Sequence, residues 1–310
     1  MSRWGDRPRH GGRTPGRRDA ERDGMTGWEH AMGEERSGRV VVVKCGGVVT
    51  EQPEPLCADL AEQYRHGNRL LLVHGGSSDI GRIAGRLGIR QQRLVGPGGV
   101  SGRYTDQATL AVVTMALAGV VKPRLVQALV RHGVPAIGLT GLDAGIVSAT
   151  EKEPFRASLD GRPAVIRDDR SGRIAAVDAG ALSRLLDAGF VPVLSPPALG
   201  RTGPLNVDAD RLAAAVAAAV AAEHLVLLSD VPGVLADLTD PGSVLARYPI
   251  ATGGGPGMSE GGMGAKLTAA RTALAAGVHV RISSGLRPEP LSAALAGQGT
   301  EVVLAPATAC

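Results

Sequence analysis

Two lysines that lie beside glycines are the residues whose types and spacing point most directly to chemistry. Lys44 is followed by Cys45, Gly46 and Gly47, and Lys266 follows the glycine-rich segment 252–265. Glycines let the backbone turn sharply and leave N–H groups free to bind an anion, while each ammonium group adds a positive charge. The pattern predicts a phosphate site with two lysines, although a lysine and two glycines after a strand also occur in an ordinary βα turn.

The scarcity of lysine favours the phosphate interpretation. The chain has 34 Lys and Arg residues in total, and only four are lysine: Lys44, Lys122, Lys152 and Lys266. Two of these four fall in the two glycine-rich stretches. Such sites are expected to require a compact ammonium group rather than the fork of a guanidinium.

The element expected to position Lys44 is a buried strand that begins near residue 39, because four consecutive valines are typical of a strand covered on both faces. A second buried strand over 69–73 ends in His74, Gly75 and Gly76, and Ser77 or Ser78 is predicted to cap the next helix. Two glycine turns at the same edge of a parallel sheet are where α/β proteins bind ligands. His74 itself is expected to hydrogen-bond the turn rather than to act as a base.

The rest of the chain alternates predicted helices and strands around two irregular excursions. Helices are expected over 53–66, 106–119, 123–133, 178–188 and 267–276, and strands over 134–139, 191–194 and 224–230. A glycine-rich loop or hairpin over 89–105 ends at Arg103, and a lid-like hairpin of mixed charge lies between 146 and 174. Asn206, Asp208 and Asp210 begin an alanine-rich helix, where a capping role alone would account for them.

Composition excludes several classes of protein. Aromatic residues are 2% of the chain, and the net charge is only +4 with no dense basic cluster outside the N-terminus, which argues against nucleic-acid binding. The three cysteines, Cys45, Cys57 and Cys310, have no metal-ligand spacing, and their odd number argues against a disulfide framework, so a reduced, cytoplasmic location is expected. No apolar run reaches the ~20 residues that span a bilayer. Residues 1–38 are predicted to be a disordered extension.

The motifs VVVKCGG, VHGGS, NVDAD, LLSDVPGVL and GGMGAK, together with Arg103, resemble the amino acid kinase family, and within it the acetylglutamate kinase branch. The resemblance runs from about residue 39 to the C-terminus. PGGVSGRYTD and SPPAL are further similar to kinases that act on α-aminoadipate or glutamate held on a LysW-type amino-group carrier protein. The family implies a three-layer α/β/α sandwich with a mostly parallel central sheet and two lobes, 39–200 for the amino acid and 201–310 for ATP.

The resemblance also implies a reaction: the γ-phosphoryl group of MgATP passes to the side-chain carboxylate of an N-blocked acidic amino acid, giving an acyl phosphate. By this match Lys44 and Lys266 bind the phosphoryl oxygens, and Asp210 holds both ammonium groups in place. Backbone N–H groups of four glycines would line the transferring group: Gly46, Gly47, Gly75 and Gly76. Magnesium is expected to be held mainly by the phosphates, and no protein ligand for it is named.

For the two ligands, the resemblance implies separate sets of residues. Arg103 should clamp the α-carboxylate, and Asn206 should bind the blocked α-nitrogen and the carboxylate. Contacts with ATP are expected from Ser229, Asp230, Gly233, Val234 and Leu235. A homodimer is also expected.

Three alternatives stay open. Free N-acetylglutamate, as in arginine biosynthesis, competes with the carrier-linked substrate of lysine-type biosynthesis, because the 150–174 hairpin mixes arginines with acids and shows no strongly basic surface for an acidic carrier. A sensor that binds nucleotide and amino acid without turnover is a second alternative. A carbamate or aspartate kinase fits the ATP lobe but not the context of Arg103 and NVDAD.

Overall fold

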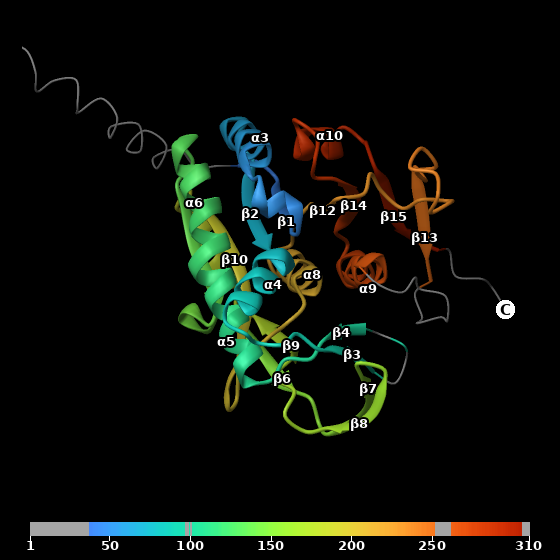
Figure 1. Cartoon of the computed structure of the whole chain (residues 1–310). Helices are drawn as coiled ribbons and strands as arrows, with labels where there is room; N and C mark the ends of the chain where they lie inside the picture. The colour runs from blue at the N-terminus through green and yellow to red at the C-terminus, as the bar shows by residue number, and fades with distance from the viewer. Residues whose placement is uncertain (1–36, 97–98, 100, 252–261, 306–310) are drawn as a thin grey trace, which may run out of the picture. The chain divides into compact units, whose positions relative to one another are not determined.

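The computed structural model describes residues 37–96, 99, 101–251 and 262–305 (Figure 1). The predicted disordered extension, residues 1–38, lies almost wholly outside the described residues, as do Cys310 and most of the glycine-rich segment 252–265. Residues 35–310 form one compact unit. The predicted division into an amino-acid lobe and an ATP lobe remains a prediction.

A mixed, mostly parallel sheet forms the centre of this unit. Its strands are β1 (Val40–Cys45), β2 (Arg69–His74), β5 (Ala136–Gly141), β6 (Val147–Glu151), β9 (Gly172–Val177), β10 (Val191–Gly200), β11 (Gly203–Leu205), β12 (His224–Ser229), β13 (Arg247–Ile250), β14 (His279–Ser284) and β15 (Thr300–Leu304). The order along the sheet is β13-β15-β14-β12-β1-β2-β10-β6-β9, with β5 and β11 also paired to β10. The pairs β6–β9, β10–β11 and β14–β15 are antiparallel.

Helices cover both faces of the sheet (Figure 1). One face carries α2 (Val48–Glu51), α3 (Glu54–Arg65), α4 (Ser77–Arg86), α5 (Gln107–Ala116), the π turn η1 (Leu117–Val121), α6 (Lys122–Arg131) and α10 (Pro290–Leu295). The other carries α7 (Ala179–Asp187), α8 (Ala209–Ala219) and α9 (Gly262–Ala275). Strand β1 contributes side chains to both hydrophobic cores, since Val42 packs on the α8 side and Val43 on the α3 side. The predicted three-layer α/β/α class is confirmed.

A second, antiparallel sheet has the order β4-β3-β7-β8. It is built from two hairpins, β3 (Arg93–Val95) with β4 (Ser101–Arg103), and β7 (Phe155–Leu159) with β8 (Arg162–Ile166). A separate small core of Leu94, Tyr104 and Ile166 lies beneath it. Both excursions predicted from sequence are therefore hairpins, and they join in one sheet rather than standing alone.

Three local predictions were wrong. The helices expected over 106–119 and 123–133 are one continuous segment, because η1 bridges α5 and α6. Ser77 and Ser78 do not cap α4: they are its first two residues, and Gly76 occupies the cap position without a side-chain bond. Lys266 lies within α9 rather than just before it, since that helix begins at Gly262 within the described residues.

The continuous helical segment Gln107–Arg131 also corrects the expectation about membranes. Its 25 residues are long and apolar enough to cross a bilayer by length and composition alone. Half of its most apolar window is buried inside the protein, and the core helix of a soluble protein meets the same criteria. The segment packs on the central sheet through buried residues such as Val113, Leu125 and Leu129.

Candidate active site

Lys44, Asp210 and Lys266 form one buried ionic cluster at the carboxyl end of β1. The Lys44 Nζ lies 2.7 Å from Asp210 Oδ1, and the Lys266 Nζ lies 3.5 Å from Asp210 Oδ2. Lys44 is 7% exposed, Lys266 8% and Asp210 5%. Lys44 lies on β1, Asp210 in the first turn of α8 and Lys266 in the second turn of α9. The fold thus brings together residues up to 222 positions apart in the chain (266 − 44).

The charges in this cluster support one another. Burial alone would raise the pKa of the Asp210 carboxyl, but the two neighbouring ammonium groups outweigh burial and lower it below its usual range. Burial alone would lower the pKa of Lys44, but Asp210 outweighs it and raises that pKa. Two ammonium groups contact the single carboxylate of Asp210, and Asp208, which also interacts with Lys44, offsets part of the remaining positive charge. An anion bound at the two ammonium groups would complete their pairing. This donor set fits a phosphoryl group.

The glycines after β1 allow the cluster to form. A Cβ on Gly46 would lie 3.3 Å from the Lys44 Nζ, so glycine lets the ammonium group lie directly over the backbone. Gly47 has φ +57° and ψ −135°, a conformation that L side chains rarely adopt. The backbone here passes close to Lys44 without a side chain in between.

In the second glycine turn, one of the N–H groups predicted to line a phosphoryl group is already used within the sheet. The N–H of Gly75 donates to the carbonyl oxygen of Cys45 at 3.0 Å, so the sheet already uses this donor. Gly76 is required by packing, because a Cβ there would lie 2.8 Å from Val121 Cγ2 and 2.9 Å from Leu117 Cδ2. The predicted lining of a phosphoryl group by N–H donors remains a prediction for Gly46, Gly47 and Gly76.

Arg103 and Asn206, the predicted amino-acid ligands, are connected through Thr105. Arg103 ends β4, and its guanidinium donates to Gln91 Oε1; it has no ion-pair partner among the described residues. Burial lowers the pKa of this half-buried guanidinium. The Asn206 Nδ2 donates to Thr105 Oγ1 at 3.2 Å. A guanidinium that pairs with no carboxylate of the described residues is suited to bind the carboxylate of a ligand.

The predicted ATP contacts begin at the end of the strand next to Lys44 and continue towards β15. Ser229 ends β12, the parallel neighbour of β1, and its hydroxyl donates to Asp230 Oδ1 at 3.0 Å. At Gly233 a Cβ would lie 2.6 Å from Thr300 Oγ1, and the N–H of Val234 donates to the same hydroxyl at 2.9 Å. Leu235 forms an isolated bridge with Val244. Packing alone therefore accounts for Gly233 and Val234, and contact with ATP stays a prediction for all five residues.

His74 has the structural role expected from the sequence. Its ring is fully buried, Nδ1 lies 2.9 Å from the Gly75 carbonyl oxygen, and burial lowers its pKa to about 3. The ring is neutral at physiological pH. In the described part of the chain no three His, Cys, Asp or Glu residues gather as a metal site.

Sequence analysis missed a buried network around Asp169. The hairpin between 146 and 174 was interpreted as a lid of mixed charge, yet Lys152 Nζ lies 3.0 Å from Asp169 Oδ2, and the Asp169 side chain is only 2% exposed. The pair of acids at 168 and 169 and the isolated Lys152 were the available signals. Which acid turns inward could be read only from the fold.

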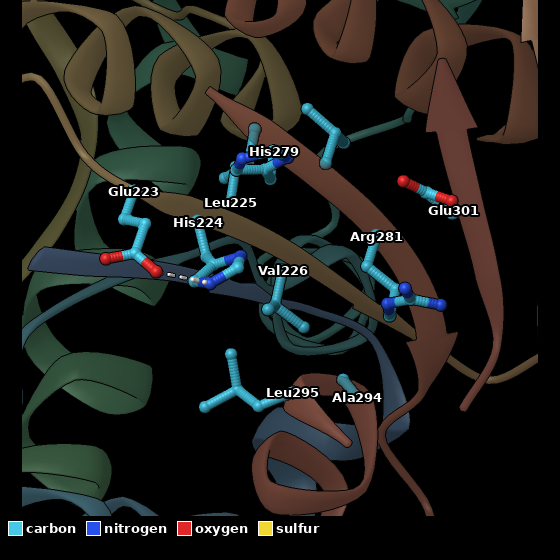
Figure 2. A pocket seen from close by; sticks show the side chains of 10 residues that line it. Glu223, His224, Leu225, Val226, His279, Arg281, Ala294, Leu295 and Glu301 are labelled. Carbon is cyan, nitrogen blue, oxygen red and sulfur yellow. Dashed lines mark ion pairs between the residues drawn. The ribbon is translucent and has the colours of Figure 1, made fainter. Parts of the chain in front are cut away.

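A cavity of about 210 Å³ lies at the other edge of the sheet, at the amino ends of β12 and β14 (Figure 2). There His224 Nε2 lies 3.1 Å from Glu223 Oε1, and the His224 and His279 rings are 5.6 Å apart. No residue predicted to bind phosphate, amino acid or ATP lines this cavity. The ionic cluster around Asp210 is therefore the candidate active site.

Comparison with known proteins defines the class. The sequence model of the amino acid kinase family matches residues 39–284. A LysW-aminoadipate kinase of Deinococcus radiodurans is 40% identical over 85% of this chain and 91% of its own length. The chain belongs to the amino acid kinase family.

Two further proteins show the range of the likeness. An acetylglutamate kinase of Symbiobacterium thermophilum is 38% identical over 87% of this chain and 93% of its own length. The solved structure of carbamate kinase from Giardia lamblia bound to AMP-PNP has a TM-score of 0.60 at 14% identity, and the match covers 87% of this chain and 100% of that one. The latter likeness concerns the fold alone.

Proposed function

We propose that this protein is an ATP-dependent kinase that phosphorylates the side-chain carboxylate of an N-blocked acidic amino acid, namely aminoadipate or glutamate linked to a LysW-type carrier protein. The observation that carries the proposal is the buried cluster in which Asp210 pairs with two lysines in a member of this family. Its carboxylate oxygens lie 2.7 Å from the Lys44 Nζ and 3.5 Å from the Lys266 Nζ. Relatives named LysW-aminoadipate kinase at 40% and 37% identity support the choice of substrate.

The chemistry follows from charge. A glutamate-like carboxyl has a pKa of ~4.3, so at pH 7 it is already an anionic nucleophile and needs no general base. Its approach to a polyanionic phosphate is opposed by repulsion, so catalysis rests on positioning and charge neutralisation. MgATP, when bound, supplies the phosphoryl group. Lys44 and Lys266 neutralise its oxygens, and Asp210 keeps both ammonium groups at fixed positions.

The magnesium ion is proposed to be held mainly by the phosphates of ATP. The described residues contain no acidic or histidine cluster that would form a metal cage. Asp210 is already engaged by two ammonium groups, which makes it a poor ligand for a further cation. Magnesium commonly keeps several waters and takes its other oxygens from substrate phosphates.

At the amino-acid end, Arg103 binds the α-carboxylate, for which its guanidinium has the bidentate geometry. Asn206 binds beside it. Because Asn206 Nδ2 donates to Thr105, its Oδ1 is left to accept the N–H of the blocked α-nitrogen. Asn206 lies only four positions before Asp210 in the chain (210 − 206), so a short segment that leads into α8 links the amino-acid end to the ionic cluster.

The carrier protein is supported by the relatives more than by surface charge. Asp160 at the tip of the β7–β8 hairpin is paired with Arg90 at 2.8 Å, and Asp169 is paired with Lys152. Four exposed arginines between residues 150 and 174 have no ion pair among the described residues: Arg156, Arg162, Arg167 and Arg173. Exposed Glu153 and Asp168 offset half of this charge. The hairpin is weakly basic, as an acidic partner would require, but not strongly so.

A hydroxamate assay tests the proposal. Hydroxylamine traps the acyl phosphate, and carrier-linked aminoadipate, carrier-linked glutamate and free N-acetylglutamate are run side by side with ATP. Turnover of a carrier-linked substrate alone is the expected result. Turnover of N-acetylglutamate alone would instead favour the second candidate, an acetylglutamate kinase, which the 38% identical relative supports. Turnover of none would contradict a kinase and favour a sensor.

Two further expectations belong to the proposal. A homodimer is expected from the family resemblance, and sedimentation at working concentration tests it. A cytoplasmic location agrees with two buried, unpaired thiols, Cys45 and Cys57. Burial raises the pKa of Cys45 to about 12, so this thiol next to Lys44 is a packing residue rather than a nucleophile.

A further inference from the structure

Asp169 is a buried carboxylate that accepts four hydrogen bonds. Its Oδ1 accepts from the backbone N–H of Thr105 at 3.2 Å and of Ser171 at 3.3 Å. Its Oδ2 accepts from Lys152 Nζ at 3.0 Å and from the Ser171 hydroxyl at 2.5 Å. The side chain is only 2% exposed, so these partners replace the hydrogen bonds that water would otherwise donate to it.

Thr105 carries the connection from Asp169 to the proposed amino-acid ligands. The residue is fully buried. Its hydroxyl donates to the carbonyl oxygen of Arg103 at 3.3 Å and accepts from Asn206 Nδ2 at 3.2 Å. Because the single hydroxyl hydrogen is used on Arg103, the Thr105 oxygen can only accept from Asn206. This fixes which end of the Asn206 amide faces Thr105 and which end faces away.

The backbone that follows Asp169 fits between the same two residues. The N–H of Arg170 donates to the Thr105 carbonyl oxygen at 2.6 Å, and the N–H of Asn206 donates to the Arg170 carbonyl oxygen at 2.8 Å. The N–H of Gly172 then donates to the Asn206 carbonyl oxygen at 2.8 Å. Segment 169–172 therefore joins Thr105, two residues after β4, to Asn206, three residues before α8.

We propose that Asp169 is a positioning residue for the amino-acid substrate, with Lys152 as its counter-ion: it fixes Thr105, and through Thr105 the backbone of Arg103 and the direction of the Asn206 amide. The inference rests on the proposed function, since it assigns these two side chains to the substrate. It explains why a buried aspartate is paired with a half-buried lysine at a distance from the Lys44 cluster.

The network predicts an effect on one substrate only. In Asp169→Asn the amide keeps an acceptor but loses the charge opposite Lys152, and its NH2 faces groups that are themselves donors. The backbone of Thr105 is then held less firmly. The KM for the amino-acid substrate is expected to rise on the order of tenfold or more, because small misplacements of binding groups are amplified. The KM for ATP should stay within about twofold, a margin below the tenfold effect that such misplacement produces.

Matched variants control for general damage. Asp187→Asn removes an exposed carboxylate from α7, where Asp187 pairs with Arg69 and lies outside the network around Thr105; it should leave both KM values unchanged. Thr105→Val removes only the hydroxyl and should raise the amino-acid KM as Asp169→Asn does, while Thr105→Ser restores it. Likewise, Lys152→Met should raise the amino-acid KM, whereas Lys152→Arg should leave it close to the wild-type value.

Hydrogen–deuterium exchange tests positioning without turnover. In Asp169→Asn the amides of Arg170, Gly172 and Asn206 should exchange faster, while that of Gly75, which is bonded within the central sheet, should not change. Unchanged exchange at all three amides, or an equal rise in both KM values, would overturn the inference. If the wild type turns over none of the amino-acid substrates, the proposed function fails, and the exchange result still decides whether Asp169 positions Thr105 and Asn206.

Discussion

Lys44 and Lys122 are equally buried lysines on opposite faces of the central sheet, at 7% and 6% exposure. Lys44 faces α8 and meets Asp210 at 2.7 Å. Lys122 begins α6 on the other face and has no ion pair within the residues that the structure describes. Burial lowers the pKa of Lys122 to about 8, opposed only partly by Asp143, whereas Asp210 raises that of Lys44.

The difference shows that a buried lysine is not in itself a sign of function. At Lys44 a carboxylate stabilises the charge, and Lys266 places a second ammonium group on the same carboxylate, so two cations lie together where an anionic ligand can bind. At Lys122 burial disfavours the charge and nothing in the described surroundings makes use of it. We therefore assign chemistry to Lys44 and a packing role to Lys122.

The largest effect is expected for Lys266→Ala. Removing one of two cations that oppose phosphate repulsion should lower kcat by about a hundred- to a thousandfold, the scale seen for loss of electrostatic stabilisation in a transition state. The fold should be retained, since the remaining Lys44–Asp210 pair is neutral. Steady-state hydroxamate formation and thermal unfolding measure the two quantities. Lys122→Met is the matched control, with kcat close to wild type; an equal loss in this control would remove the comparison.

The local environment of Lys44 could be predicted from sequence because its signals are contiguous. Four valines indicate a buried strand, and the lysine and glycines follow directly, so no long-range information is needed. The same holds for β2 and its glycine turn, and for the β7–β8 hairpin, where Asp160 and Gly161 have positive φ values of 47° and 82°.

What could not be predicted depends on contacts between distant segments. Gly119 and Pro123 indicated a break between two helices, but a π turn over Leu117–Val121 carries the helix up to the proline, which lacks an N–H in any case. Asp169 resembled the exposed acids beside it, and only its meeting with Thr105, 64 residues away, turns it into a buried residue.

A smaller effect, on stability, is expected for Lys122→Met. One pKa unit corresponds to ~1.4 kcal/mol, and removing a charge that burial disfavours should stabilise the protein on the order of 2 kcal/mol at pH 7. The lowered pKa of Lys122 in the folded state fixes the direction in which stability changes with pH. Between about pH 8 and 10.5 native Lys122 has lost its proton while the unfolded chain still holds it, so the stability contributed by this residue rises with pH.

Denaturant unfolding at pH 7 and pH 10 measures this effect. The advantage of Lys122→Met over the wild type should shrink at the higher pH, because the wild-type lysine is then neutral in the folded state. An advantage that is the same at both pH values would mean that the charge of Lys122 is not the cause. Arg156→Met, an exposed residue without an ion pair among those described, serves as a control and should change stability little at either pH.

The smallest effects sharpen the comparison through the glycine that faces each lysine. A Cβ on Gly46 would lie 3.3 Å from the Lys44 Nζ, the mobile end of that side chain, whereas a Cβ on Gly138 would lie 2.9 Å from Cδ and 3.0 Å from Cγ of Lys122, within its packed stem. Gly46→Ala should therefore displace an ammonium group and lower kcat several-fold, with unfolding free energy changed by less than about 1 kcal/mol.

Gly138→Ala should do the reverse. Overpacking against the stem of Lys122 and against Val126, 3.3 Å away, is expected to lower the unfolding free energy by about 1 kcal/mol or more while kcat is unaffected. Hydroxamate formation and chemical unfolding, measured on both variants, give the two quantities. If both glycines affected kcat, Lys122 would belong to the active site as Lys44 does; if neither did, the position of the Lys44 ammonium group would not limit the reaction.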